Sequence, residues 1–440
     1  MSLVRSLLVC FGAAAFGLPA LLSQAGATAP ESAVAARSAV EWLEAQQQPD
    51  GSFEVAGFPG FETPDAVLAI AEQAQIDASW STDEALAGVE AIDADGISTF
   101  AGDAVPDALD ALDDFAEGGL SAGQAAKLIV LDASPLGLDA QAFDPQSDGN
   151  PVDLESFVTS AIQPDGSYGA FNATLFAVIS NHLTGAPISG ATIALIEAAQ
   201  QANGAWNYAG DPTGTDVDPD TTGLAMQALV AEGASYATPS IGNALKFLAA
   251  SHQADGSWPG PFDSGNPNST ALAIHGIVAA GYDPASPCWR DAADSSQQGT
   301  PYTSPDAYLI GTQTVDGNLS SPNDSWGLNT FATSQGVQGL LRSWLPVAQA
   351  TVQTCSTPPT TTSPTGTSPT TISTTTPTTS LATPASTPTD VQGKVVSANS
   401  GITTRKLPNT GGISTALAGV GVAALAIGIG AHFATRRRRA

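Results

Sequence analysis

The stretch that decides the fold runs from Ala199 to Ala228 and joins two helices through a turn. It begins Ala199-Gln200-Gln201-Ala202-Asn203-Gly204-Ala205-Trp206 and resumes, after a loop, as Asp216-Val217-Asp218-Pro219-Asp220-Thr221-Thr222-Gly223-Leu224-Ala225-Met226-Gln227-Ala228. The Asn-Gly pair tolerates positive φ, so a helix can stop there and the aromatic side chain can fold back on it. The stretch therefore predicts a helix, a turn, an acidic loop and a second helix.

Four further turns repeat this pattern with variations. They read Gln46-Gln47-Gln48-Pro49-Asp50-Gly51-Ser52-Phe53, Gln163-Pro164-Asp165-Gly166-Ser167-Tyr168, Gln253-Ala254-Asp255-Gly256-Ser257-Trp258 and Gln313-Thr314-Val315-Asp316-Gly317-Asn318-Leu319. Internal similarity at such spacing indicates a protein built from repeated supersecondary units. Residues 77–153 show helical patterning but no clean turn motif, so the pairing of helices is open there.

Two kinds of helix alternate around these turns. Those before a turn are amphipathic, as in residues 36–44 and 241–248, and we expect them to form an outer layer. Thr238 is the predicted N-cap of the second, with Pro239 at its first position. Those after a turn, such as residues 222–233 and 270–281, are small or apolar almost all round, which is typical of helices buried on every side.

These turns resemble the repeat of terpenoid cyclases and protein prenyltransferases, a superfamily whose members share an all-α, α/α-toroid fold. The resemblance covers roughly residues 32–345 and implies about six pairs of outer and inner helices around a ring. An open α-solenoid is the alternative architecture.

The resemblance also draws attention to Asp218 and Asp220. Class II terpene cyclases protonate an alkene with the middle aspartate of an Asp-x-Asp-Asp motif at the start of an inner helix. When Asp218-Pro219-Asp220-Thr221 is aligned with this motif, Asp220 matches the proton-donating aspartate and Asp218 matches the first aspartate. Thr221 replaces the last aspartate. Only 6% of the chain is aromatic, whereas a cyclising cavity needs aromatic walls to stabilise cations.

Two other roles compete for the same acidic residues. Asp220 stands where Asn172, Asn268 and Asn329 stand at the starts of other inner helices, and asparagine makes the same helix cap without acidity. We therefore expect Asp220 to be a helix N-cap. Asp216, Asp218 and Asp220 also alternate like the opening of a calcium loop, although no EF-hand glycine or glutamate follows. We therefore expect no cofactor, with calcium as the one alternative. A solvated acidic loop explains the same pattern without a bound ion.

The distribution of charge separates the middle of the chain from its ends. The chain has a net charge of −29, and residues 28–355 hold every acidic residue except Asp390. Such a surface repels nucleic acid. The three histidines of this segment, His182, His252 and His275, have no zinc-ligand spacing. Cys288 and Cys355 remain after removal of a signal peptide, and we expect them to form a disulfide in an oxidising compartment.

Both ends of the chain indicate export and anchoring. Residues 1–27 have the pattern of a secretory signal peptide. Residues 356–404 are rich in Ser, Thr and Pro and predict a disordered stalk. Residues 405–440 resemble the cell-wall sorting signal of Gram-positive bacteria. It consists of an LPxTG motif cut by sortase, an apolar span at 413–435 and a basic tail, and the motif reads Leu407-Pro408-Asn409-Thr410-Gly411.

The sequence thus predicts a toroid of residues 28–355 displayed on a Gram-positive cell wall, with sortase and peptidoglycan as partners and contact with the membrane only through the sorting helix. We expect it to bind a ligand or to mediate surface contact without catalysis. The alternative is a divergent class II terpene cyclase that uses Asp218 and Asp220.

Overall fold

The computed structural model describes residues 31–54, 62–77, 80–94, 99–100, 103–104, 107–214, 217–260, 264–320 and 329–345. The predicted signal peptide, stalk, sorting signal and apolar span lie outside these ranges, as do Asp216 and Cys355. The anchoring, calcium and disulfide predictions that depend on them therefore stay predictions. Within the ranges described, no helix is both long and apolar enough to cross a membrane.

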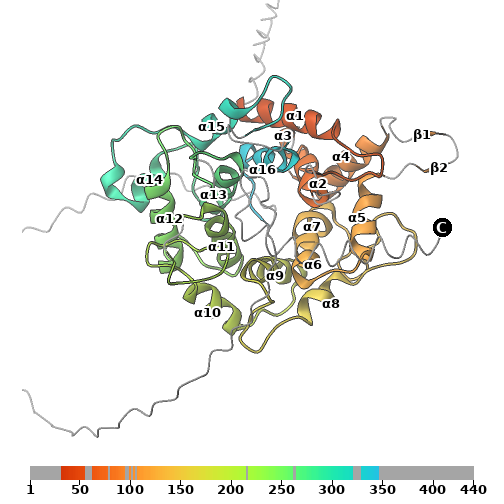
Figure 1. Cartoon of the computed structure of the whole chain (residues 1–440), viewed down its shortest axis with the longest axis horizontal. Helices are drawn as coiled ribbons and strands as arrows, with labels where there is room; N and C mark the ends of the chain where they lie inside the picture. The colour runs from red at the N-terminus through yellow and green to blue at the C-terminus, as the bar shows by residue number, and fades with distance from the viewer. Residues whose placement is uncertain are drawn as a thin grey trace, which may run out of the picture.

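Within these ranges, six helices form an inner ring. They are α2 (Thr63–Ala71), α6 (Ala122–Leu128), α9 (Phe171–Thr184), α11 (Pro219–Ala231), α13 (Pro267–Ala279) and α16 (Thr330–Leu340). Each packs against the next, with the π-helical turn η1 (Ile129–Ala133) completing the contact of α6 with α2, and α16 closes the ring onto α2 (Figure 1). All residues of α2 and nearly all of α11 and α13 are buried, as expected for helices covered on every side.

A second layer of helices surrounds this ring. One outer helix precedes each inner helix: α1 (Glu31–Glu44), α5 (Ala108–Glu117), α8 (Leu154–Thr159), α10 (Gly190–Ala198), α12 (Pro239–Ser251) and α15 (Pro305–Thr312). The remaining elements are α3 (Ala74–Asp77), α4 (Thr82–Ala94), α7 (Ser134–Leu136), α14 (Cys288–Ala293), the 3₁₀ turn η2 (Ser295–Gln297) and the short strands β1 (Thr99–Phe100) and β2 (Asp103–Ala104). The all-α class and the two-layered ring of six pairs are confirmed. In residues 77–153, where the sequence left the pairing of helices open, the outer helix is α5 and the inner helix is α6.

In the five repeats that carry the turn motif, a threonine links the turn to its inner helix. The backbone N–H of the residue at the aromatic position donates to the hydroxyl of a threonine on that helix, at 2.9–3.1 Å in all five turns. The pairs are Phe53–Thr63, Tyr168–Thr174, Trp206–Thr222, Trp258–Thr270 and Leu319–Thr333. The indoles of Trp206 and Trp258 donate instead to carbonyls of the preceding outer helix. These two turns are therefore bonded to both layers.

The glycine of each turn packs against the next outer helix in the ring. Gly204 has a φ of +93°, and a Cβ there would lie 2.3 Å from the carbonyl oxygen of Asn243 on α12. Gly317 makes the same approach to Ser38 on α1, at 2.4 Å. Only glycine combines this φ with so close a contact, so the last turn closes the circle onto the first helix.

The residues after α16 cross one mouth of the ring. Ser343 contacts Gln75 just beyond the end of α2, and the backbone N–H of Leu345 donates to the Gln227 side chain on α11 at 2.6 Å. These two inner helices lie on opposite sides of the ring (Figure 1). Gln227 lies in the C-terminal half of α11, so the start of this helix, with Asp218 and Asp220, lies toward the other mouth.

Candidate functional site

Asp218, not Asp220, is the N-cap of α11. Its Oδ1 accepts from the Thr221 backbone N–H at 2.9 Å, and its Oδ2 accepts from the Thr221 hydroxyl at 2.8 Å and the Tyr208 backbone N–H at 3.0 Å. Pro219 occupies the first helical position, where its missing N–H costs nothing. The Asp218 carboxylate therefore connects the loop at Tyr208 with the start of α11.

The repeat threonines give the register of the other helix starts. Asn266 caps α13 and Asn329 caps α16. Each lies four residues before the threonine of its repeat, Thr270 or Thr333, as Asp218 lies four residues before Thr222. Asn268 matches Asp220, as predicted, but Asn329 does not. The expectation that Asp220 caps its helix was therefore wrong, because the cap lies two residues earlier in the chain.

Asp220, which does not cap the helix, is a buried carboxyl with one oxygen that accepts no hydrogen bond. It is 8% exposed, and its Oδ1 has no hydrogen-bond partner. Burial and then the charge of Asp218 raise the pKa of Asp220 to about 8. Ser269 on α13 opposes this shift weakly, since its hydroxyl approaches the carboxyl without forming a hydrogen bond of normal geometry. At neutral pH Asp220 is therefore mostly protonated.

Two glycines account for the burial of this carboxyl. A Cβ on Gly276 of α13 would lie 2.9 Å from the Cα of Gly223, and a Cβ on Gly223 would lie 2.1 Å from the carbonyl oxygen of Leu272. The backbones of α11 and α13 are therefore in direct contact one turn after Asp220. This approach brings Ser269 beside Asp220 and excludes water from it.

Other polar groups of the inner helices are buried without full partners. The Asn268 amide donates to Gln335 on α16 at 3.1 Å, while its own Oδ1 accepts nothing. His275 on α13 is fully buried, neither ring nitrogen has a partner, and burial lowers its pKa to about 4. Buried polar groups are normally satisfied by protein, water or ligand. The inner surface between α11, α13 and α16 is therefore polar.

A second buried polar cluster, which the sequence reasoning missed, lies between α2 and α6. Lys127 Nζ lies 2.5 Å from Asp65 Oδ2. Glu62 and Asp132 are fully buried beside this pair without hydrogen bonds, and burial, followed by the charge of Asp65, raises the pKa of both. A lysine inside the apolar run Ala125–Ala133 was the signal for this cluster, and Asp132 lies in the π-helical turn η1, a feature that often marks functional positions.

The histidines, whose spacing in the sequence does not suit zinc, lie apart from one another in the fold. His182 pairs with Glu232 on the surface, and His252 stacks in a cluster with Trp258, Trp289 and Tyr302 between α12 and α14. No zinc site is formed by the histidines of the described segments. This aromatic cluster belongs to the outer layer, so it does not line the ring near Asp220.

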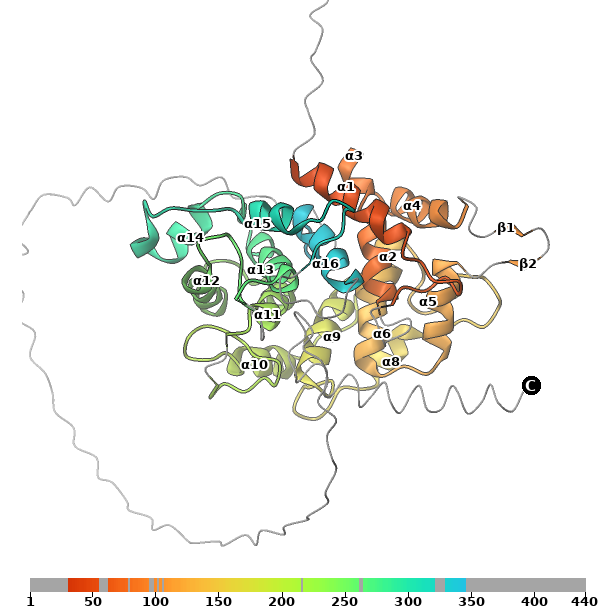
Figure 2. The ribbon, with the colours of Figure 1, turned by 45° about the horizontal axis from the view of Figure 1, so that its top comes forward.

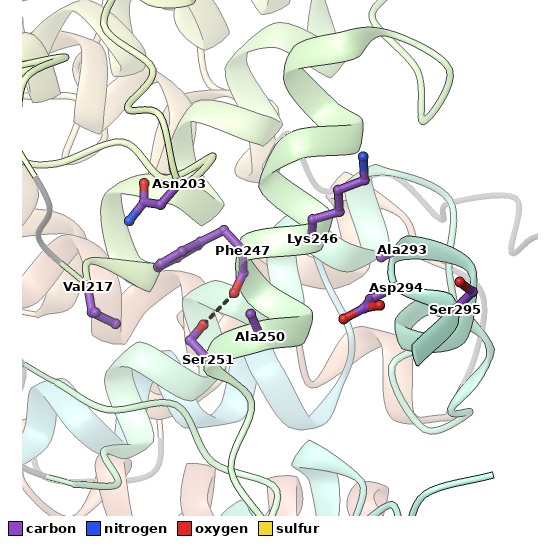
Figure 3. Close-up of a pocket in the computed structure, with 9 residues that line it drawn as sticks. All are labelled: Asn203, Val217, Lys246, Phe247, Ala250, Ser251, Ala293, Asp294 and Ser295. Atoms are coloured by element: carbon purple, nitrogen blue, oxygen red, sulfur yellow. Dashed lines mark hydrogen bonds between the residues drawn. The ribbon is translucent and has the colours of Figure 1, made fainter. Parts of the chain in front are cut away.

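An open surface cavity of about 710 Å³ lies in the outer layer (Figure 3). Its lining consists of Asn203, Val217, Lys246, Phe247, Ala250, Ser251, Ala293, Asp294 and Ser295. None of these residues belongs to an inner helix. The cavity is therefore separate from the buried polar groups described above.

No protein-family model and no curated protein matches the chain. Among solved structures it is similar to MstE, a type II terpene cyclase from Scytonema. Against a point variant of MstE with its substrate geranylgeranyl dihydroxybenzoate, the TM-score is 0.48 at 13% identity, covering 71% of this chain and 97% of the other. Against another point variant of MstE with the product merosterolic acid A, the TM-score is 0.47 at 14% identity, covering 71% of this chain and 96% of the other.

A protein from Actinoplanes gives a TM-score of 0.45 at 15% identity, over 71% of this chain and 99% of the other. These values mark a distant likeness in overall fold. The roles of individual residues follow from the contacts in this chain alone.

Proposed function

We propose that the protein is an acid-catalysing enzyme in which Asp220 donates a proton to a substrate held at the mouth of the inner ring. The main support for this proposal is the environment of Asp220. Its side chain is buried, and its Oδ1 has no hydrogen-bond partner. Asp218, rather than Asp220, caps the helix. A general acid must stay protonated near the working pH. The raised pKa of this carboxyl supports that requirement.

The substrate class that suits such an acid is an alkene-bearing isoprenoid, the chemistry suggested by the Asp218–Asp220 motif. The O–H bond of Asp220 breaks as a C–H bond forms on one alkene carbon, which leaves a carbocation on the other. A second double bond of the substrate then closes a ring onto the cation, and loss of a proton from carbon to solvent restores a double bond. Solvent then returns a proton to the Asp220 carboxylate. The product is an isomer of the substrate, so no oxidant or reductant is needed.

The test is to incubate the purified chain with squalene, geranylgeranyl diphosphate and geranylgeranyl dihydroxybenzoate and to search for products of unchanged mass and altered retention. We expect Asp220→Asn to abolish product while Asp211→Asn, an exposed residue of the same loop, leaves it intact. The rate should fall as the pH rises past about 8, where Asp220 loses its proton. Product formation that survives Asp220→Asn contradicts the assignment.

A second candidate, a toroid that binds a polar ligand without chemistry, is favoured by the unpartnered groups of Asn268, His275 and Gln338. The aromatic cluster around Trp258 lies in the outer layer, where it cannot stabilise a carbocation at Asp220. Native mass spectrometry of the gently purified chain distinguishes the two. A retained polar ligand that is lost in His275→Leu, together with no turnover of the isoprenoids, supports binding.

We propose, on the motif Leu407–Gly411 and its flanking pattern, that the chain is exported and anchored to the wall of a Gram-positive bacterium by sortase. Peptidoglycan is then its covalent partner. Thr410→Ala should release the protein from the wall fraction into the medium or the membrane, and wall attachment that persists in this variant contradicts the proposal.

A further inference from the structure

A group of three carboxylates connects the outer helix α5 with the loop that joins α7 to α8. Helices α5 and α8 lie on the same side of the inner ring (Figure 2). Asp113 comes from α5, and Asp144 and Asp148 come from the loop. One carboxylate oxygen from each lies within 4.8 Å of the others. Oxygens bound to one Ca²⁺ at about 2.4 Å are separated by up to about 5 Å, so the three fit around a single ion.

Asp113 is the member of this group that indicates a ligand. It is 0% exposed, and neither of its carboxylate oxygens has a hydrogen-bond partner. The Gln146 amide approaches it without normal hydrogen-bond geometry. The charged groups of the described chain that act on Asp113 are all acidic, namely Asp144, Asp148 and Glu117. A buried carboxylate facing only like charges is costly unless a proton or a cation neutralises it.

The loop holds the other two carboxylates in place. Phe143 and Val152 exchange backbone hydrogen bonds at 3.0 and 2.9 Å across its base, and Phe143 is fully buried. Asp144 accepts the backbone N–H groups of Asp148 and Gly149, at 2.9 and 3.1 Å. These bonds use one lone pair on each oxygen of Asp144 and leave the others available.

From this geometry we propose that Asp113, Asp144 and Asp148 bind one Ca²⁺, which fastens the α7–α8 loop to α5. Ca²⁺ suits the site because it accepts six to eight oxygen ligands in irregular geometry, so backbone carbonyls of the loop and water can complete the shell. Mg²⁺ demands near-octahedral geometry at shorter distances. This site is distinct from the calcium pattern that the sequence suggests at Asp216, Asp218 and Asp220.

The proposal is tested by adding Ca²⁺ to the chelator-treated chain and measuring its thermal midpoint and, by calorimetry, its binding stoichiometry. We expect a rise of several degrees and one site per chain. Asp113→Asn should abolish both, whereas Asp114→Asn, the neighbouring exposed residue of α5, should retain both. The exposed Asp148→Asn gives a second test without risk to the core, and we expect it to weaken Ca²⁺ binding at least tenfold.

In chelator, Asp113→Asn should be at least as stable as the parent chain, because a neutral amide replaces a buried, unpartnered carboxylate. A Ca²⁺-dependent rise that persists in Asp113→Asn, or its absence from the parent chain, overturns the site. An equal rise with Mg²⁺ at the same concentration overturns the assignment to Ca²⁺.

Discussion

The side-chain amide of Gln313, in the last turn motif, donates a hydrogen bond to the carbonyl of Ala35 in the first helix at 2.8 Å. The same amide donates to the carbonyl of Gly317 at 2.7 Å, so one side chain joins its own turn to α1. Gln200 makes the equivalent pair of bonds within the ring, to Gly204 and to Ser240. The closure between the two ends of the fold therefore uses the contact that joins internal repeats.

Gly317→Ala is predicted to open this closure. The new Cβ would meet the carbonyl oxygen of Ser38 at 2.4 Å, and the φ of +104° disfavours any side chain. We expect a loss of about 3 kcal/mol in the free energy of unfolding, from overpacking and backbone strain together. Urea denaturation measures it.

Gly311→Ala is the matched control, since Gly311 lies on α15 with nothing near its Cβ position. This substitution should stabilise the chain by about 0.5–1 kcal/mol through helix propensity. Equal effects of the two alanines would show that the last turn does not close the ring.

The stability of the protein should fall as the pH rises, in part through Glu72. Burial raises the pKa of Glu72 to about 8, and the Ser343 hydroxyl opposes the shift. The folded chain thus keeps this proton up to about pH 8, while the unfolded chain releases it near the ordinary value of 4.5. Between these limits the folded state binds more protons, so stability declines with rising pH, by up to about 1.4 kcal/mol per pH unit from this group.

Glu72→Gln keeps the shape and removes the titration. Thermal midpoints measured from pH 5 to pH 8 should decline less steeply in this variant than in the parent chain, and Glu90→Gln, on the exposed face of α4, should follow the parent. A parallel decline in parent and Glu72→Gln would mean that Glu72 is ionised in the folded chain.

Lys127→Met is predicted to destabilise the start of the ring. The substitution leaves Asp65, whose side chain is 6% exposed, without its cation. Removal of one partner of a buried ion pair lowers the free energy of unfolding by roughly 3–5 kcal/mol. The double variant Lys127→Met, Asp65→Leu should recover most of this loss, because no buried charge is then left unpaired. Chemical denaturation of the single and double variants measures both effects.

Lys246→Met provides the control on the exposed side of α12 and should change stability by less than about 0.5 kcal/mol. If Lys127→Met behaves like this control, the pair with Asp65 contributes nothing to the fold.

The sequence by itself determined the repeated unit, because its signals are local. A glycine that adopts positive φ stops the helix, a buried aromatic follows, and a small, apolar helix begins soon afterwards. The N-caps of α11 and α13 could also be predicted from the sequence. Proline favours the first position of a helix, so Pro219 and Pro267 mark the residues before them, Asp218 and Asn266, as the caps. Applying that rule at Thr238 and Pro239 gave the right start for α12.

The tertiary structure decided what brings distant residues together. The pairing of α5 with α6 carries no turn motif, and Lys127 meets Asp65 only because the ring places α6 beside α2. The burial that raises the pKa of Asp220 accompanies the contact of Gly223 with Gly276, and Asp113 meets Asp144 only when the α7–α8 loop packs on α5. Burial and charge proximity set these properties, and both depend on how helices far apart in the chain pack rather than on the local order of residues.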